Sequence, residues 1–130
     1  MAHLVVDGMN VIGSRPDGWW RDRDGAVLRL FARLVRLAEA GDDDAVTVVL
    51  DGRPLDELPE GAHRGVNVAY ARRAGRDAAD DRIIELLRDL PDPSAVRLVT
   101  SDRALAGRAR DLGATVGGAR ELLTRLDRLE

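Results

Sequence analysis

Short runs of β-branched and apolar residues alternate along this chain with longer segments of helical periodicity. The predicted strands are residues 3–6, 46–50, 65–70, 96–100 and 114–116, and the predicted helices are residues 25–40, 78–90, 103–112 and 119–129. Strands that alternate with helices form βαβ units, in which the helices cover a parallel sheet. The sequence therefore predicts an α/β fold of three layers (α/β/α) around a central, mostly parallel sheet. We expect one domain spanning residues 1–130.

Four acidic residues lie where a predicted strand ends or a predicted helix begins: Asp7, Asp51, Asp80 and Asp102. The carboxyl ends of parallel strands lie along one edge of a sheet, and ligands bind at that edge. Carboxylates gathered there repel one another unless a cation joins them. The pattern indicates a metal site, and a metal site in a small domain favours hydrolysis.

The three acids at the start of the helix 78–90 differ in the face that they occupy. The residues three, four and seven places after Asp80 are apolar: Ile83, Ile84 and Leu87. Asp80 is therefore expected on the buried stripe, where a carboxylate needs a partner such as a metal ion to remain charged. Asp77 is expected to cap the helix with its side chain, and Asp81 lies on a mixed face. The helix dipole alone favours acids at this end.

Structural roles remain open for the other residues of the predicted edge. Asp7 or Asn10 could cap the turn after the first strand. Ser101 or Asp102 could cap the helix 103–112. Asp51, followed by Gly52, could start an ordinary turn. For each residue considered singly, this structural role is an alternative to a catalytic or metal-binding role.

The basic side chains other than two histidines are all arginine, since the sequence contains no lysine. Guanidinium groups suit bidentate contacts to phosphate. Four of them flank the strand 65–70 and lead into the acidic helix: Arg64, Arg72, Arg73 and Arg76. They are candidates to hold a phosphate backbone, and a salt-bridged surface is the alternative. The turn-rich segment 11–24 is expected to rise over the carboxyl edge, where Trp19 and Trp20 would either stack on a base or cover the rim of the core.

Composition excludes several classes of protein. The chain has no cysteine, which excludes disulfides and thiolate metal sites. No run approaches the roughly 18 apolar residues of a membrane span, and the N-terminus has no signal-like segment, so we expect a cytoplasmic protein with no membrane partner. The net charge of −3 does not exclude nucleic acid, because local charge decides binding. With two Trp, one Tyr and one Phe, a wide base-stacking platform is not expected.

Four motifs together resemble a known family. The segments 5–12 (VVDGMNVI), 50–52 (LDG), 79–84 (ADDRII) and 99–103 (VTSDR) match, in this order, the bacterial YacP-like branch of the NYN domains, within the PIN-like ribonuclease superfamily. The resemblance extends from Leu4 to about Gly118. It implies a PIN-like fold and an endoribonuclease that depends on Mg²⁺ or Mn²⁺. It also implies RNA as the partner, and some members of this branch act in association with the ribosome.

The resemblance carries over to individual positions. It makes Asp7 the acid of the first strand with Asn10 as its companion amide, and Asp80 the helix acid with Asp81 beside it. Asp102 matches the acid after the fourth strand, with Ser101 as its hydroxyl neighbour. The predicted catalytic residues are Asp7, Asn10, Asp80 and Asp102; the predicted metal ligands are Asp7, Asp80, Asp81 and Asp102. The predicted substrate-binding residues are Arg72, Arg73, Arg76 and Ser101.

Other functions fit the sequence less well. A haloacid-dehalogenase-like phosphatase needs a second Asp two places after the first, where this chain has Met9. A receiver domain needs a lysine, and a dinucleotide-binding fold needs a Gly-x-Gly-x-x-Gly turn that the segment 7–13 does not supply. Two alternatives stay open: a non-catalytic RNA- or ribosome-binding module with the same fold, and a PIN-type toxin.

The expected reaction of the nuclease is in-line attack of water on a phosphodiester, which leaves 5′-phosphate and 3′-hydroxyl ends.

Overall fold

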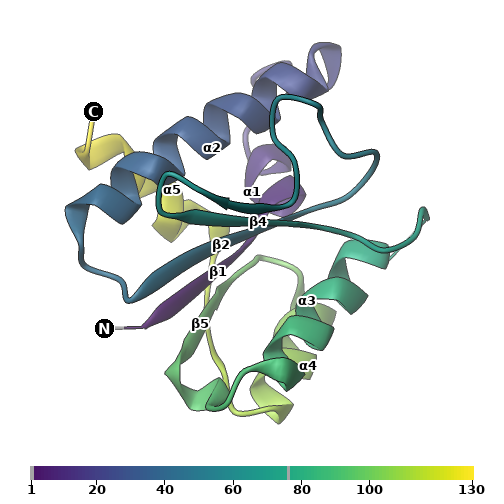
Figure 1. The fold of residues 1–130 in the computed structure, drawn as a ribbon, viewed down its shortest axis with the longest axis vertical. Helices are drawn as coiled ribbons and strands as arrows, with labels where there is room; N and C mark the ends of the chain where they lie inside the picture. The colour runs from purple at the N-terminus through teal and green to yellow at the C-terminus, as the bar shows by residue number, and fades with distance from the viewer. Residues whose placement is uncertain (1, 76) are drawn as a thin grey trace.

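The computed structural model describes residues 2–75 and 77–130 and contains one six-stranded sheet (Figure 1). The strand order is β3-β4-β2-β1-β5-β6, and every pair is parallel except β3 with β4. The strands are β1 (His3–Asp7), β2 (Ala45–Leu50), β3 (Gly61–His63), β4 (Val66–Tyr70), β5 (Val96–Val99) and β6 (Thr115–Gly117). The helices are α1 (Gly8–Gly13), α2 (Arg23–Ala40), α3 (Ala78–Asp89), α4 (Arg103–Asp111) and α5 (Ala119–Arg128), with short 3-10 turns η1 (Trp19–Arg21) and η2 (Pro93–Ala95).

The predicted three-layer architecture is confirmed. Helices α1, α2 and α5 lie on one face of the sheet, and α3 and α4 lie on the other (Figure 1). Strand β1 shows how its sequence serves both faces: Leu4 and Val6 pack into the core under α2 and α5, whereas Val5 packs into the core under α3 and α4. Both faces of the central strands are therefore buried. Across the described residues, no helix has both the length and the hydropathy needed to cross a bilayer.

The strand β3 was not predicted. It is a three-residue edge strand that pairs antiparallel with β4 through a two-residue turn. The turn residues Arg64 and Gly65 both have positive φ, of 52° and 85°, as a two-residue hairpin turn of type I′ requires. Because β3 is short and mostly exposed, its sequence has no alternating apolar pattern that would predict a strand. Gly65 in the turn was a signal that could have predicted the hairpin.

The segment after β1 is more ordered than expected. Instead of an irregular loop, it forms the six-residue helix α1 and the turn η1. Val11 and Ile12 are buried and anchor α1 against the core. Trp19 packs on the same core, while Trp20 is 57% exposed. Trp19 therefore covers the rim of the core, and Trp20 is the exposed ring of the pair, with the Arg21 guanidinium 6.0 Å from its centroid.

The strand order reverses between β1 and β5. From β1 the chain builds outward through β2 and β4, and then α3 carries it back to β5 on the other side of β1. At such a reversal the connections leave the sheet in opposite directions, so a crevice opens beyond the carboxyl ends of the two strands. Asp7 ends β1, and Thr100 directly follows β5 at this point.

Candidate active site

Asp7 is a buried carboxylate at the centre of the carboxyl edge, only 5% exposed. Thr100 Oγ1 donates a hydrogen bond of 2.9 Å to Asp7 Oδ2. The next residue, Gly8, lets α1 start directly against β2, because a Cβ there would lie 2.7 Å from Leu50 Cδ2 and 3.0 Å from the Val49 carbonyl oxygen. Glycine at this position thus holds the strand end and its carboxylate close to the sheet.

The electrostatic setting of Asp7 is unfavourable to its charge. Its pKa is raised from 3.8 to about 6, mainly by burial and also by the charges of the nearby carboxylates of Asp80 and Asp102. The hydrogen bonds from Thr100 and from the Asn10 backbone N–H oppose the rise. Three acids that are far apart in the sequence therefore act on one another across the carboxyl edge.

Asp80 lies in the first turn of α3 and is half-buried, as the helical periodicity predicted. Burial is the main cause that raises its pKa, followed by the charges of Asp102 and Asp77, while Arg108 acts in the opposite direction. The side chain therefore lies on the α3 face that meets the edge. Its carboxylate is the partner that α3 contributes to Asp7.

Asp102 has a structural role and a position in the acid cluster at the same time. Its Oδ1 accepts a hydrogen bond of 3.0 Å from the Leu105 N–H and caps α4. Its own N–H donates to Thr100 Oγ1 at 3.1 Å, and its charge raises the pKa values of both Asp7 and Asp80. Capping occupies one carboxylate oxygen, so the two explanations weighed from the sequence are compatible. We call Asp7, Asp80 and Asp102 the acid cluster.

Asn10 and Ser101 tie the surrounding elements together. Asn10, in α1, accepts a 2.8 Å hydrogen bond from the Ser101 N–H through Oδ1. Ser101 Oγ in turn accepts a 3.1 Å hydrogen bond from the Ala119 N–H at the start of α5. The two side chains link α1 to the loop before α4 and to α5. Because Oδ1 of Asn10 already accepts this hydrogen bond, the side chain is held in place and its Nδ2 is left to donate to a ligand.

Asp81 lies beside Asp80 in sequence but in a different environment. It is exposed, and its carboxylate pairs with Arg73 at 2.6 Å and with Arg108 at 3.2 Å. The hydrogen bonds from Arg73 and Arg108 hold the pKa of Asp81 below its usual value. The structure thus places Asp81 in an arginine-paired position outside the acid cluster, and its role as a metal ligand stays a prediction.

The arginines expected to bind substrate are also paired. Arg72 contacts Glu85 at 2.7 Å, and Arg73 contacts Asp81. Arg76 lies outside the described residues. These ion pairs fit the salt-bridged surface that was the alternative explanation, so phosphate binding by these residues is also still a prediction.

Asp51 and Asp77 are not members of the acid cluster, although the charge of Asp77 helps to raise the pKa of Asp80. The carboxylate of Asp51 pairs with Arg23. Asp77 occupies the N-cap position of α3 with a left-handed backbone (φ 63°), and among the described residues its side chain caps no N–H of the helix. The predicted N-cap position of Asp77 is confirmed, but the capping hydrogen bond is not made in the described residues, because the left-handed conformation turns the residue away from the first helical turn.

Thr100 is the residue of this site that was not predicted from the sequence. It is only 2% exposed and contacts both Asp7 and Asp102. A polar side chain directly after the buried pair Leu98 and Val99 was the signal that could have identified it, since such a group needs a hydrogen-bond partner.

The donor set of the acid cluster consists of carboxylate oxygens, the ligands that Mg²⁺ and Mn²⁺ prefer. Within residues 2–75 and 77–130, however, no three acidic or histidine side chains are arranged to hold one ion directly. The cluster fits an ion that is held by one or two carboxylates and keeps several waters, as Mg²⁺ commonly is. The mutual repulsion of Asp7, Asp80 and Asp102 is what such an ion would relieve.

Comparison with known proteins agrees with this architecture. Residues 4–130 match the family model described as the YacP-like NYN domain. The crystal structure of Rae1 (YacP) from Bacillus subtilis is 26% identical, with a TM-score of 0.78 over 99% of this chain and 75% of that chain. A crystal structure of a mutant of the same Bacillus subtilis protein is 28% identical, with a TM-score of 0.78 over 99% of this chain and 77% of that one. No curated protein sequence matches the chain.

Proposed function

The chain belongs to the YacP-like NYN domain family, a family of PIN-like nucleases, and from this premise we propose that it is an endoribonuclease dependent on Mg²⁺ or Mn²⁺. One observation carries the proposal. Asp7 is buried at the carboxyl edge, and its pKa is raised to about 6 by burial and by the charges of Asp80 and Asp102. Perturbed acids gathered in this way are typical of functional sites.

Each residue of the site has a proposed role. Asp7, Asp80 and Asp102 would bind the divalent cation together, one or two of them directly and the rest through waters that the ion keeps. When bound, the cation lowers the pKa of a water molecule and neutralises charge on the phosphoryl oxygens. Thr100 fixes the orientation of the Asp7 carboxylate through its 2.9 Å hydrogen bond. Asn10, whose Oδ1 is engaged by Ser101, presents its Nδ2 to an oxygen of the phosphate or of the attacking water.

The proposed reaction is hydrolysis of an RNA phosphodiester by in-line attack of water. A carboxylate with a pKa of about 6 is mostly ionised at neutral pH, so Asp7 can accept a proton or bind a cation there. The products would carry 5′-phosphate and 3′-hydroxyl ends. Association with the ribosome is a prediction that cosedimentation with ribosomal subunits tests.

A second candidate function is a non-catalytic RNA-binding module with the same fold. The observation that favours it is that no three acids in the described part of the chain are arranged to hold an ion directly. Such a module would bind RNA without turnover. The same assay separates the two functions.

The test is cleavage of a structured hairpin RNA and an unstructured RNA in the presence of Mn²⁺ or Mg²⁺. We expect cleavage that EDTA abolishes, and Asp7→Asn and Asp80→Asn should each lower the rate about 100-fold or more, as loss of one preorganised electrostatic group does. Asp81→Asn is the matched comparison, since it removes the same charge one position along α3 and tests the metal-ligand role that the family resemblance gives to Asp81. We expect it to keep a rate within about threefold of the wild type, because exposed ion pairs contribute little.

The outcomes divide cleanly. Cleavage that survives both Asp7→Asn and Asp80→Asn, or that EDTA leaves unchanged, rejects the proposed function. RNA binding by the wild type without turnover in either metal supports the non-catalytic module. An Asp81→Asn variant as inactive as Asp80→Asn would place Asp81 among the metal ligands after all.

A further inference from the structure

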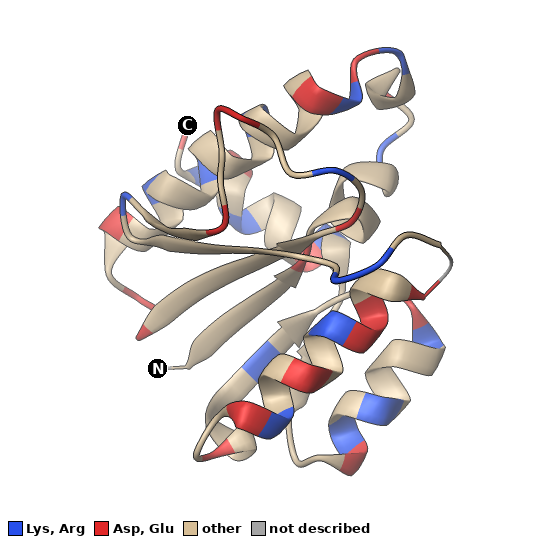
Figure 2. Ribbon diagram, turned by 45° about the vertical axis from the view of Figure 1, so that its right-hand side comes forward, with Lys and Arg blue, Asp and Glu red and all other residues tan. Residues whose placement is uncertain are grey.

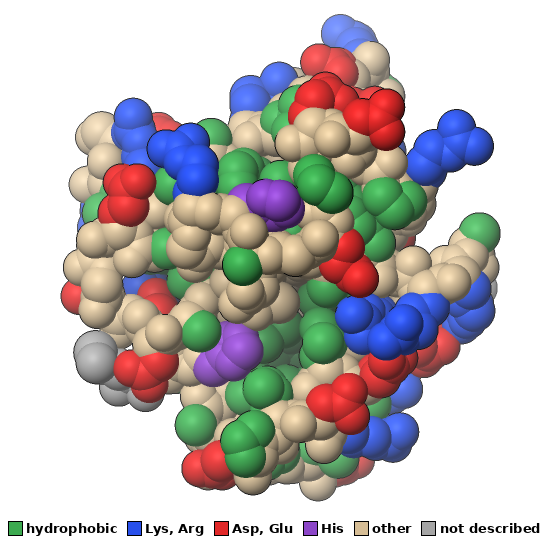
Figure 3. Space-filling model, viewed as in Figure 1, with side chains coloured by type: hydrophobic (Ala, Val, Ile, Leu, Met, Phe, Trp, Pro, Cys, Tyr) green, Lys and Arg blue, Asp and Glu red, His purple; other side chains and the backbone are tan. Residues whose placement is uncertain are grey.

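Arginines lie on two sides of the acid cluster, and the two sides differ in charge balance. The α3 side is neutralised: α3 contains four acidic residues and two arginines, and Arg72 and Arg73 in front of it pair with Glu85 and Asp81. Red and blue segments alternate along α3 in Figure 2. In the space-filling view, acidic and arginine side chains lie next to each other over the same helix (Figure 3). A phosphate would have to displace carboxylates to bind there.

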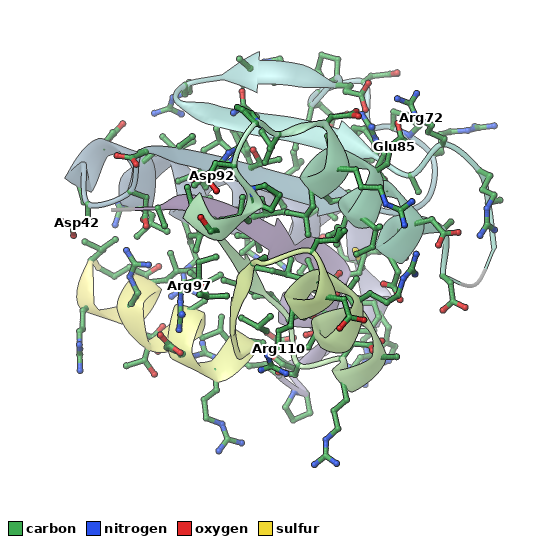
Figure 4. The ribbon with its side chains drawn as sticks, turned by 90° about the horizontal axis from the view of Figure 1, so that it is seen from below. Asp42, Arg72, Glu85, Asp92, Arg97 and Arg110 are labelled. Atoms are coloured by element: carbon green, nitrogen blue, oxygen red, sulfur yellow. The ribbon has the colours of Figure 1, made fainter. Side chains whose placement is uncertain are left out.

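The α4 side carries an excess of positive charge. Helix α4 contains three arginines and one acidic residue. In the part of the chain that the structure describes, three exposed arginines of α4 and α5 form no ion pair: Arg103, Arg110 and Arg120. Figure 4 shows Arg110 beside α5, well apart from Arg72 and Glu85. These guanidiniums can bind an anion without breaking an existing pair.

Two cavities on this side meet at Ser101. The first, of about 420 Å³, lies between α4 and the turn after β6, and its lining includes Thr100, Asp102, Arg103 and Arg110. The second, of about 610 Å³, lies between the end of α1 and α5, and its lining includes Arg15 and Arg120. Ser101 lines both cavities. We call the two cavities together the α4–α5 groove.

The groove borders the acid cluster at Asp102. Thr100 and Asp102 line its first cavity, and the same Thr100 donates a hydrogen bond to Asp7. Both volumes fall within the range of about 300–1,000 Å³ that is typical of ligand pockets. Hollows of this size accept nucleotide units of one strand rather than the side of a duplex.

We propose that the α4–α5 groove binds the phosphodiester backbone of single-stranded RNA through Arg103, Arg110 and Arg120 and leads the strand to the acid cluster. The proposal rests on the proposed function for the identity of the substrate. Backbone contacts by guanidiniums supply affinity without reading sequence. The low aromatic content also favours binding through phosphates rather than through base stacking.

The test measures binding apart from cleavage. In an Asp7→Asn background, the affinity for a fluorescein-labelled oligouridine of about 16 nucleotides is measured by fluorescence anisotropy at several salt concentrations. The site variant combines Arg103→Gln, Arg110→Gln and Arg120→Gln. The control variant combines Arg36→Gln, Arg88→Gln and Arg128→Gln, three exposed arginines that line neither cavity. Both variants remove three positive charges.

We expect the site variant to bind at least about tenfold more weakly at low salt. Its slope of log affinity against log salt should fall by about 2, since each phosphate contact to a single strand contributes about 0.7. The control variant should stay within about threefold of its parent. Equal effects of the two variants, or an unchanged slope in the site variant, would overturn the proposal. So would a larger loss on Arg72→Gln with Arg73→Gln.

Two further measurements keep the result interpretable. Circular dichroism and thermal unfolding check that both variants fold; if the site variant does not, the single Arg110→Gln and Arg120→Gln variants should each lower the slope by about 0.7. The wild type is assayed for cleavage in parallel. If the salt slope falls in the site variant but the wild type does not cleave RNA, the proposed function is rejected and RNA binding in the α4–α5 groove is supported. If the wild type cleaves RNA but the salt slope of the site variant is unchanged, the proposed function is supported and RNA binding in the groove is rejected.

Discussion

Thr100 Oγ1 donates a 2.9 Å hydrogen bond to Oδ2 of Asp7 across the two strand ends at which the order of the sheet reverses. The two residues are 93 positions apart in the sequence, yet both are almost fully buried. The hydroxyl also accepts a hydrogen bond from the Asp102 N–H. A single threonine therefore orients one acid of the cluster and positions the backbone of another.

We predict that Thr100→Val shifts the pH dependence of RNA cleavage. Because the hydrogen bond from Thr100 holds the pKa of Asp7 down, its loss should raise that pKa above about 6, and the acid limb of the kcat/KM profile should move to higher pH. An unpaired buried acceptor should also lower the free energy of unfolding by about 1–3 kcal/mol. Thr100→Ser, which keeps the hydroxyl, is the control. An acid limb that stays in place in Thr100→Val would show that Asp7 does not set it.

We predict that Asp7→Asn stabilises the protein when divalent cations are removed. Folding raises the pKa of Asp7 from 3.8 to about 6, so the native state binds the proton more tightly than the unfolded state. The free energy of unfolding of the wild type therefore falls as the pH rises between these two values and stays low above about 6. The total loss is about 3 kcal/mol, from about two pKa units.

Urea unfolding in EDTA measures this effect. Near pH 4 the wild type and Asp7→Asn should have similar stability, and at neutral pH the variant should be more stable by up to about 3 kcal/mol. If the wild type is as stable as Asp7→Asn at neutral pH, the charge of Asp7 does not destabilise the folded state. That result would contradict the effect expected from its burial and from the nearby charges of Asp80 and Asp102.

We predict that Gly8→Ala destabilises the fold by about 1–3 kcal/mol, the usual range for overpacking. The added Cβ would lie 2.7 Å from Leu50 Cδ2 and 3.0 Å from the carbonyl oxygen of Val49, and the backbone of β2 cannot yield easily. Gly107→Ala in α4 is the control, since a Cβ there meets nothing within 4 Å. That control should raise stability by about 0.5–1 kcal/mol, and thermal unfolding compares the two. Equal effects would mean that the contact at Gly8 relaxes freely.

Much of the fold could be predicted because its central strands are buried on both faces. Five strands appear as short apolar, β-branched runs, and four helices have clear periodicity. Helix α1 could not be found this way, since six residues span fewer than two turns and leave too little periodicity to detect. Strand β3 was hidden because an exposed edge strand has no buried face to mark it.

The acid cluster was predictable in part, because parallel strands must place Asp7 and Asp102 at the same edge and helical periodicity places Asp80 toward it. The roles of the arginines were not predictable. Proximity in sequence to the acidic helix indicated Arg72 and Arg73, but tertiary packing brings Glu85 and Asp81 against them. The exposed arginines of α4 and α5 adjoin the cluster only through the loop around Ser101, which sequence spacing does not reveal.

The most direct measurement of the central claim is the anomalous difference map of a crystal soaked with Mn²⁺. We predict one main peak between Asp7, Asp80 and Asp102, within direct or water-mediated reach of all three carboxylates, and no peak there in Asp80→Asn crystals soaked in the same way. A main peak away from these residues, or none at saturating Mn²⁺, would contradict the claim that the three acids form one cation centre.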